Sequence, residues 1–247
     1  MSASTDRSTD DDAATGPTRN RILAGAWRPA SLLYLTALLA AMAIGLWPEA
    51  IFPSRADVRA APLPALQVLA VVQVSYFLLV YPLIVLVRSA RRTPQPYLAP
   101  ALAEVVTQLL IALPFYVAAG YLADATLLDC LRTAAYVSCV CLAALAAGAL
   151  LAEDTPAKAP ILLILIIAAV GLPAAYYLAR EFLAALGQPH WLWHLAPATF
   201  AWETAASRPP TQPQTPLWAP GPLWPWLVWP ALAAAGLCLR AIHHGRH

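Results

Sequence analysis

Six long apolar segments alternate with polar connections along this chain and occupy most of it. They cover residues 30–47, 66–87, 98–120, 131–151, 159–179 and 222–240. Each is close to the ~20 residues that a helix needs to cross a hydrocarbon core of ~30 Å. None has a charge near its middle. The pattern therefore predicts an all-α, polytopic membrane protein with six transmembrane helices.

Composition supports this class, because apolar residues make up 60% of the chain and charged residues only 11%. Ordinary globular domains have about 25% charged residues. The exception is the segment 1–20, where four aspartates stand among serine and threonine. This segment has too little apolar surface to fold, so we expect a disordered N-terminal tail. Residues 21–247 would then form the transmembrane domain.

The placement of basic residues predicts an orientation. Lysine and arginine collect on the cytoplasmic side of membrane proteins. With the N-terminus inside, ten of the 15 lysines and arginines are cytoplasmic and five are outside. Both termini are therefore predicted to be cytoplasmic, with a long outer loop at 180–221, in a chain of the cell inner membrane. A net charge of +2 gives no indication of a nucleic-acid partner.

Several motifs of enzymes are missing from the sequence. It has no G-x-x-x-x-G-K-[ST] loop for nucleotide phosphates, no H-E-x-x-H and no G-x-S-x-G. These motifs supply phosphate binding, a zinc site and a serine nucleophile, respectively. We therefore expect a protein that is not itself an enzyme and that obtains any energy from a partner.

A few polar residues interrupt the apolar segments. Glu104 and Gln108 are four residues apart in the third segment, so a helix places them on one face. Such groups usually bond to a neighbouring helix, and Gln73 in the second segment is another example. The alternative is that this face lines a path between subunits. Glu104 is close enough to the inner surface to pair with Arg91 or Arg92.

The segment 190–203 is rich in tryptophan and contains His190 and His194. Two histidines four residues apart can hold a metal or a haem iron if the segment is helical. A belt of tryptophans at the membrane surface explains the composition more simply. We therefore expect no cofactor, and His190 and His194 remain weak candidates for metal ligands.

The end of this segment carries a resemblance to a known family. The string from Trp193 to Glu203, WHLAPATFAWE, resembles the W-x-x-x-N-P-[LF]-T-[YF]-x-x-[DE] segment of ABC type-2 permeases, with Ala196 at the asparagine position. In that family the segment lies in the outer loop between the fifth and sixth helices, as it does here. The cytoplasmic termini and the basic loop between the second and third apolar segments are similar too.

The resemblance implies the membrane-spanning permease subunit of an ATP-driven ABC transporter of the exporter type, in the inner membrane. Its partners would be an ABC ATPase subunit, a second permease subunit of the same or a different chain, and the lipid bilayer. By position, the residues implied for ATPase docking are Arg88, Arg91, Arg92, Glu104, Glu153, Asp154 and Lys158. Those implied for an outer gate are Pro197, Thr199, Phe200 and Glu203. A haem-handling or cytochrome-assembly protein and a non-transporting membrane scaffold remain as alternatives.

Pro197 predicts a local break in this outer segment. Proline lacks an N–H group and disfavours helical geometry at the residue before it. We expect two short helices around Pro197, at or dipping into the outer face, because lipid cannot satisfy free backbone groups. The Thr199 hydroxyl would bond a freed carbonyl, Phe200 and Trp202 would anchor the segment at the interface, and Glu203 would face water.

Overall fold

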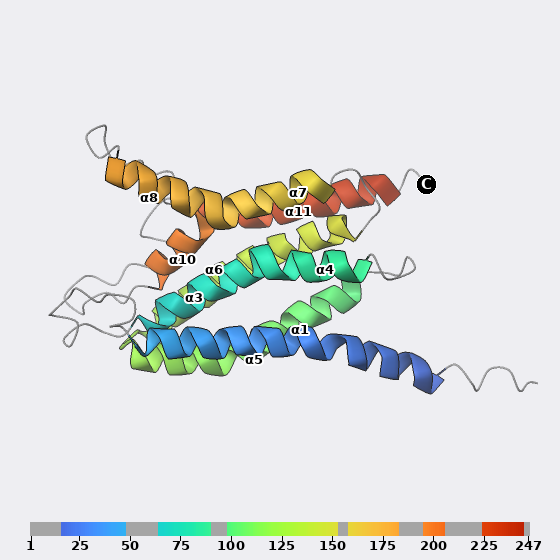
Figure 1. The fold of residues 1–247 in the computed structure, drawn as a ribbon, viewed down its shortest axis with the longest axis horizontal. Coiled ribbons are helices and arrows are strands. Elements are labelled where there is room, and N and C mark those ends of the chain that lie inside the picture. The colour runs from blue at the N-terminus through green and yellow to red at the C-terminus, as the bar shows by residue number, and fades with distance from the viewer. Residues whose placement is uncertain are drawn as a thin grey trace, which may run out of the picture.

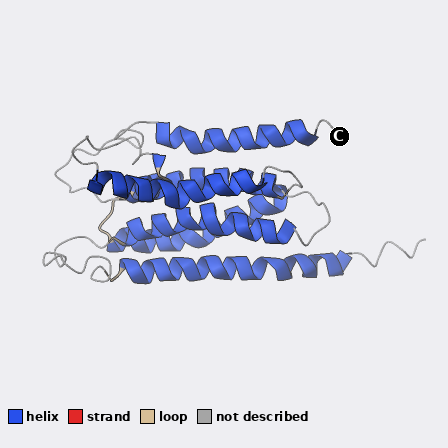
Figure 2. Ribbon diagram, turned by 45° about the horizontal axis from the view of Figure 1, so that its top comes forward, coloured by secondary structure: helices blue, strands red, loops and turns tan. Residues whose placement is uncertain are grey.

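A computed structural model describes the chain over 16–47, 64–89, 98–152, 158–182, 195–205 and 224–244 (Figure 1). Within these ranges the regular structure is helical throughout and contains no strand (Figure 2). Four helices are long and apolar enough to cross a membrane, which makes this a multi-pass membrane protein. They are Ala65–Ser89, Pro100–Leu122, Leu127–Leu151 and Lys158–Ala179, and Ala30–Gly45 and Pro225–Ala241 are shorter apolar stretches.

Two of the long helices contain a π turn in the middle. The first consists of α3 (Ala65–Ser75), the π turn η2 (Tyr76–Val80) and α4 (Tyr81–Ser89). The second consists of α7 (Lys158–Ile166), the π turn η3 (Ile167–Gly171) and α8 (Leu172–Phe182). The remaining helices are α1 (Gly16–Gly45), α5 (Leu98–Leu122), α6 (Leu127–Leu151), α10 (Pro197–Thr204) and α11 (Trp224–His244).

The helix α3–η2–α4 and the helix α6 form the centre of the bundle. In each, 61% of the apolar stretch is buried, against 33% in α5 and 17% in α7–η3–α8. Figure 1 shows α1 and α5 on one side of this centre and α7, α8 and α11 on the other. Helix α1 begins and α11 ends at the same end of the bundle, which we call the termini end (Figure 1). The short helix α10 lies at the opposite end, called the α10 end.

The helix boundaries differ from the sequence-based expectation at three places. Helix α1 begins at Gly16, so residues 16–20 are helical and do not belong to the predicted tail, while 1–15 lie outside the described residues. Helix α6 begins at Leu127 and not at 131, because Thr126 and Asp129 form a capping box. Helix α8 continues to Phe182, into the segment 180–221 that the sequence predicts as a loop.

Gly45 permits the close approach of α1 to α3. A methyl group at Gly45 would lie 2.6 Å from Cα of Ala65, well inside contact distance. The Gly45→Ala variant is therefore expected to lower the free energy of unfolding by about 1–3 kcal/mol, as for other overpacked positions. Denaturation by sodium dodecyl sulfate in mixed micelles measures this change.

Gly171 in η3 provides the matched control. A methyl group there would meet Cγ2 of Ile167 at 3.5 Å, which is an ordinary contact. Alanine also favours helix by about 1 kcal/mol relative to glycine. The Gly171→Ala variant should therefore be neutral or slightly stabilising. Equal destabilisation by both substitutions would contradict a special role for Gly45.

Candidate functional site

One face of α5 carries a buried row of polar side chains. Glu104, Gln108 and Tyr116 follow one another at multiples of four residues, so they share this face. They are only 3%, 0% and 6% exposed, respectively. The face packs against α3 and α1, and its polar groups bond to residues of α3, η2 and α4. The prediction that Glu104 and Gln108 share a helix face with partners on neighbouring helices is confirmed.

At the termini end of this row, Glu104 forms an ion pair with Arg88. The Arg88 Nη1 atom donates to Glu104 Oε2 at 2.7 Å. The arginine side chain is 26% exposed, whereas that of Glu104 is 4% exposed. The carboxylate is therefore the buried partner. In the described residues the partner of Glu104 is Arg88, in the last turn of α4. The predicted partners Arg91 and Arg92 lie outside the described residues, so that pairing stays a prediction.

One turn further along α5, Gln108 connects three helices through Tyr76. The Gln108 Nε2 atom donates to Tyr76 Oη at 3.3 Å, and Tyr76 Oη donates to the carbonyl oxygen of Ala30 at 3.3 Å. Tyr76 is the first residue of η2, and its ring centroid lies 4.9 Å from that of Tyr34. The bonds therefore join α5, η2 and α1 within the apolar region of the bundle.

A second amide, Gln73 in α3, has partners at both of its ends. Its Nε2 atom donates to Tyr34 Oη at 3.0 Å, and its Oε1 atom accepts from Tyr116 Oη. Gln73 and Tyr34 have no exposed surface. The polar groups of α1, α3, η2, α4 and α5 together are here called the α5 polar row: Tyr34, Gln73, Tyr76, Arg88, Glu104, Gln108 and Tyr116.

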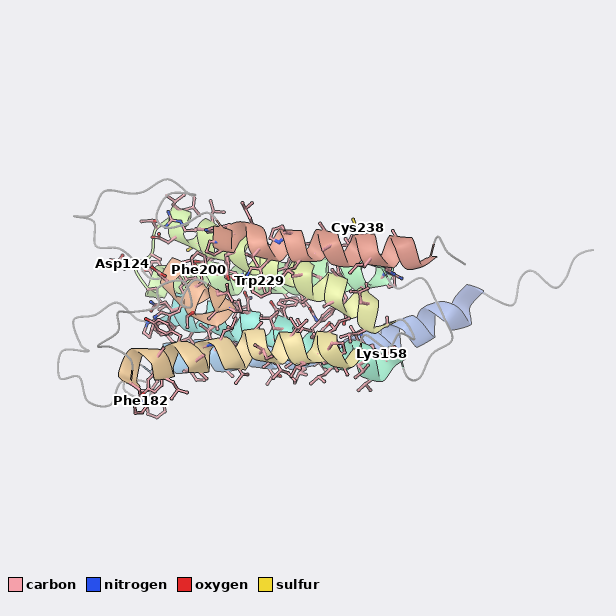
Figure 3. The ribbon with its side chains drawn as sticks, turned by 90° about the horizontal axis from the view of Figure 1, so that it is seen from above. Asp124, Lys158, Phe182, Phe200, Trp229 and Cys238 are labelled. Carbon is pink, nitrogen blue, oxygen red and sulfur yellow. The ribbon has the colours of Figure 1, made fainter. Side chains whose placement is uncertain are left out.

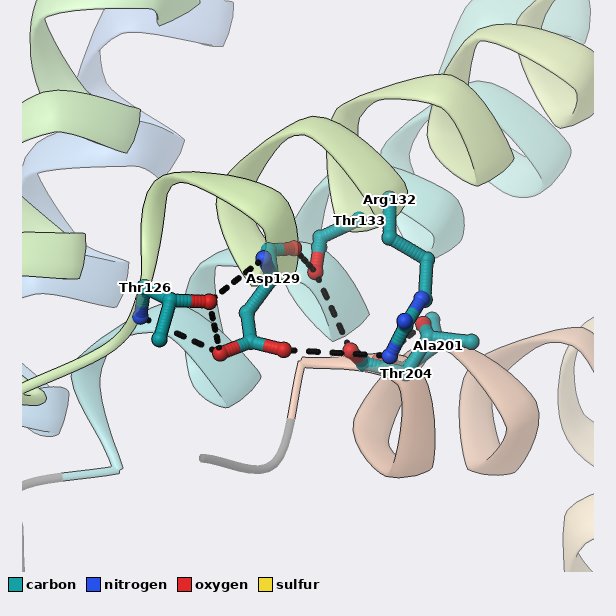
Figure 4. A network of polar contacts seen from close by, with 6 residues as sticks. All are labelled: Thr126, Asp129, Arg132, Thr133, Ala201 and Thr204. Carbon is teal, nitrogen blue, oxygen red and sulfur yellow. Dashed lines mark hydrogen bonds and ion pairs between the residues drawn. The ribbon is translucent and has the colours of Figure 1, made fainter. Parts of the chain in front are cut away.

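A separate polar cluster lies at the α10 end, where α6 begins (Figure 4). Asp129 Oδ2 accepts from the backbone N and the hydroxyl of Thr126, at 3.1 and 2.7 Å. Asp129 Oδ1 lies 3.7 Å from Nη1 of Arg132, and both residues are buried. Thr133 Oγ1 lies 2.7 Å from the carbonyl oxygen of Asp129 and 3.4 Å from that of Thr204 in α10. The cluster therefore links the start of α6 to the end of α10.

Sequence reasoning missed this cluster, although a signal was present. The apolar pattern places the start of this helix at 131 and counts Arg132 only as one of the five basic residues on the outer side. The Thr126-x-x-Asp129 spacing is a capping box, which predicts a helix N-terminus four residues earlier. With the helix extended in this way, Asp129 and Arg132 stand three residues apart on one face and can pair.

Helix α10 begins at Pro197, as the sequence predicted. Ala196 before it is extended, with φ −79° and ψ 112°. The Thr199 hydroxyl donates to the carbonyl oxygen of Ala196 at 2.9 Å, which is the predicted bond to a freed carbonyl. Glu203 is exposed, also as predicted. The other predicted short helix, before Pro197, falls largely outside the described residues.

The interior of α10 is packed into the bundle, against α3 and α6. Ala201 has no exposed surface and Phe200 is 4% exposed. The Phe200 ring lies 4.9 Å from that of Tyr136 and 6.3 Å from that of Trp226. The prediction that Phe200 anchors the segment at the membrane surface is therefore wrong, because its ring contributes to the core. A solvated, extended coil is excluded for 195–205.

An aromatic group from three helices holds α10 in place. Trp229 Nε1 in α11 donates to Tyr136 Oη in α6 at 3.1 Å, and the Trp226 ring packs edge-on against that of Tyr136 at 5.6 Å. Figure 3 shows Phe200 and Trp229 close together, nearer to the end marked by Asp124 than to the end marked by Lys158. We call Tyr136, Phe200, Trp226 and Trp229 the aromatic cluster.

The residues predicted for docking are only partly described. Arg88 and Glu104 are brought together, and Lys158 is the first residue of α7, at the same end of the bundle (Figures 1 and 3). Arg91, Arg92, Glu153 and Asp154 lie outside the described residues, and so do His190 and His194. In the described ranges no group of three or more His, Cys, Asp or Glu side chains could hold a metal ion.

Comparisons with protein-family models, with curated proteins and with solved structures give no match. The function of this chain is therefore inferred from the arrangement of its own residues.

Proposed function

We propose that this chain is the membrane-spanning permease subunit of an ATP-driven ABC transporter that exports its substrate. Six apolar helices would cross the inner membrane, with both termini in the cytoplasm. The observation that best supports the proposal is α10. It is a short helix that starts at Pro197, between the fifth and sixth apolar segments, and it is buried against α3 and α6. This is the position of the permease segment that the string Trp193 to Glu203 resembles.

The division of labour follows from what this chain contains. Its helices can form part of a path through the membrane, but the sequence has no phosphate-binding loop of the G-x-x-x-x-G-K-[ST] type. A separate ATPase would bind at the termini end, where the Arg88–Glu104 pair and Lys158 lie. Residues Arg91, Arg92, Glu153 and Asp154 would complete the docking surface. The α7–η3–α8 helix, only 17% buried, offers a wide apolar face to lipid or to a second permease subunit.

The α10 end would contain the outer gate. Pro197 and Thr199 fix the start of α10, and Phe200 fills the space between α6 and α11. In this proposal the packed rings of Phe200, Tyr136 and Trp226 would form the closed state of the gate. Passage of a substrate would require α10 to move away from the aromatic cluster, and Glu203 on its exposed side would then be the first charged group that a leaving substrate meets.

Labelling of introduced cysteines tests the proposed topology. The four native cysteines are first replaced with alanine or serine, and single cysteines are then placed at Thr211 and at Gln95. In cells with a permeabilised outer barrier, a membrane-impermeant thiol reagent should label the cysteine at 211 and leave that at 95 unlabelled. Positive-inside counting is the basis of this expectation. The reverse labelling pattern would exclude the proposed orientation.

Co-purification tests the proposed partner. The chain purified alone should hydrolyse no ATP, whereas co-expression with an ATPase subunit encoded beside it should give a stable complex that does. Replacement of Arg88, Arg91 and Arg92 with alanine should weaken that complex. The cysteine at 211 reports in parallel whether orientation is kept, because these arginines are also strong cytoplasmic anchors. If the triple variant keeps both its topology and full ATPase binding, the docking assignment is wrong.

The same purified sample distinguishes the alternatives. A haem-handling protein would show a haem absorbance band and no ATPase partner. A scaffold would show neither haem nor a stable ATPase complex, and either result would replace the permease proposal.

A further inference from the structure

The α5 polar row contains two buried oxygen atoms that accept no hydrogen bond. They are Oε1 of Glu104 and Oε1 of Gln108, and neither has a donor in the described part of the chain. The two residues are 3% and 0% exposed, so bulk water does not reach them. Leaving a buried acceptor unsatisfied is costly, and more so for a carboxylate. The two residues stand one helical turn apart on α5, and their unsatisfied acceptors indicate a ligand that donates hydrogen bonds.

The geometry limits the size of this ligand. Side chains four residues apart on a helix have Cβ atoms roughly 5–6 Å apart. One oxygen atom placed about 2.8 Å from each of two acceptors can bridge side chains at this spacing. Water has two donor hydrogens, which equals the number of unsatisfied acceptors, and buried water typically makes two to four such bonds.

The charges of Arg88 and Glu104 limit the charge that this ligand can carry. Arg88 and Glu104 already form a neutral pair at 2.7 Å. A metal cation would give this region a net positive charge within the apolar part of the bundle, where unpaired charge is unfavourable. Among the residues that the structure describes, Asp124, Asp129 and Glu203 belong to the opposite, α10 end of the bundle. A neutral donor adds no charge.

We infer that the chain binds one water molecule between Glu104 Oε1 and Gln108 Oε1, beside Tyr76. This water completes the bonding of the carboxylate that Arg88 holds on its other oxygen. It makes the Glu104 end of the α5 polar row hydrated, whereas the Gln73 end is dry, because the Gln73 amide has protein partners on both atoms. The inference concerns a binding site in this chain and does not depend on the proposed transport function.

Radiolytic hydroxyl-radical footprinting tests the inference, because radicals formed from a bound water oxidise the side chains that it touches. The unmodified chain in nanodiscs is irradiated in water enriched in ¹⁸O and analysed by mass spectrometry. Tyr76 should be oxidised several-fold more than Tyr34 and Tyr116. Tyr34 and Tyr116 are suitable controls because they are 0% and 6% exposed, whereas Tyr76 is 3% exposed. If exposure alone determined oxidation, Tyr116 would be oxidised more than Tyr76.

Substitutions at the two glutamines show which amide binds the water. Gln108→Leu removes one acceptor, so oxidation of Tyr76 should fall to the level of Tyr34. Gln73→Leu removes an amide of the dry end and should leave oxidation of Tyr76 unchanged. The comparison of tyrosines within the unmodified chain decides the question even if either variant fails to fold.

Two results would overturn the inference. If oxidation of Tyr76 is as low as that of Tyr34, and Tyr116 is oxidised more than both, no water is bound. The Gln108 amide would then be rotated, so that its nitrogen donates directly to Glu104, since amide oxygen and nitrogen differ only in their bonding. Equal oxidation of Tyr34, Tyr76 and Tyr116 would mean that water enters the whole row, with no specific site at Glu104 and Gln108.

Discussion

Replacement of Arg88 with methionine is expected to lower the free energy of unfolding by about 3–5 kcal/mol, the usual cost of removing one partner of a buried ion pair. Methionine keeps much of the length of the arginine stem, so the loss arises mainly from the charge. The Glu104 side chain is 4% exposed and cannot turn to solvent when its partner is missing. The measurement is denaturation of the purified chain in mixed micelles.

The two partners should respond unequally, because their burial differs. Glu104→Met leaves a 26% exposed arginine that can extend its head group toward water, so this variant should lose less stability. The double variant should recover most of the loss of Arg88→Met, because no unpaired charge remains. Arg88→Lys keeps the charge and serves as the control. Equal losses in both single variants, with no recovery in the double variant, would contradict the assignment of Glu104 as the buried partner.

Phe200→Ala is expected to release α10 from the bundle. The ring is 4% exposed and contacts Tyr136 and Trp226, and removal of a buried phenylalanine side chain typically costs about 3–5 kcal/mol. Because α10 is only eight residues long and isolated helices of this length are unstable in water, the loss should appear as local unfolding. Amide hydrogen exchange over Pro197–Thr204 should accelerate strongly, while exchange in the middle of α6 should change little.

Glu203→Ala provides the matched control in the same short helix. Its side chain is exposed, so hydrogen exchange in α10 should stay close to that of the unmodified chain. Similar acceleration by Phe200→Ala and Glu203→Ala would indicate that the aromatic contacts do not hold α10 in place.

The features that the sequence predicted well depend on local chemistry. Long apolar runs determine where membrane helices form, and Pro197 determines where α10 begins, because it excludes a helical residue at Ala196. The Thr199 bond to Ala196 was predictable for the same reason, since donor and acceptor are three residues apart. The shared face of Glu104 and Gln108 follows from helical periodicity alone.

The features that it missed depend on which helices pack together. Gln73 bonds Tyr34 and Tyr116, which are 39 and 43 residues away in sequence, and no local pattern selects them. Arg88 was not recognised as a partner of Glu104, because Arg88, Arg91 and Arg92 carry the same charge. The choice depends on where α4 ends relative to α5. The burial of Phe200 was missed because its contacts with Tyr136 and Trp226 join three separate helices, and no local pattern predicts such contacts.

The π turn η2 sets the rotational phase between α3 and α4. A π turn holds one residue more than an α turn, and one residue corresponds to a rotation of roughly 100° about the helix axis. Gln73 and Tyr76 stand at or before this turn, and Arg88 stands after it. The extra residue therefore decides that all three face the same row on α5. Deletion of a single residue from η2 would therefore turn Arg88 away from Glu104 without altering either side chain.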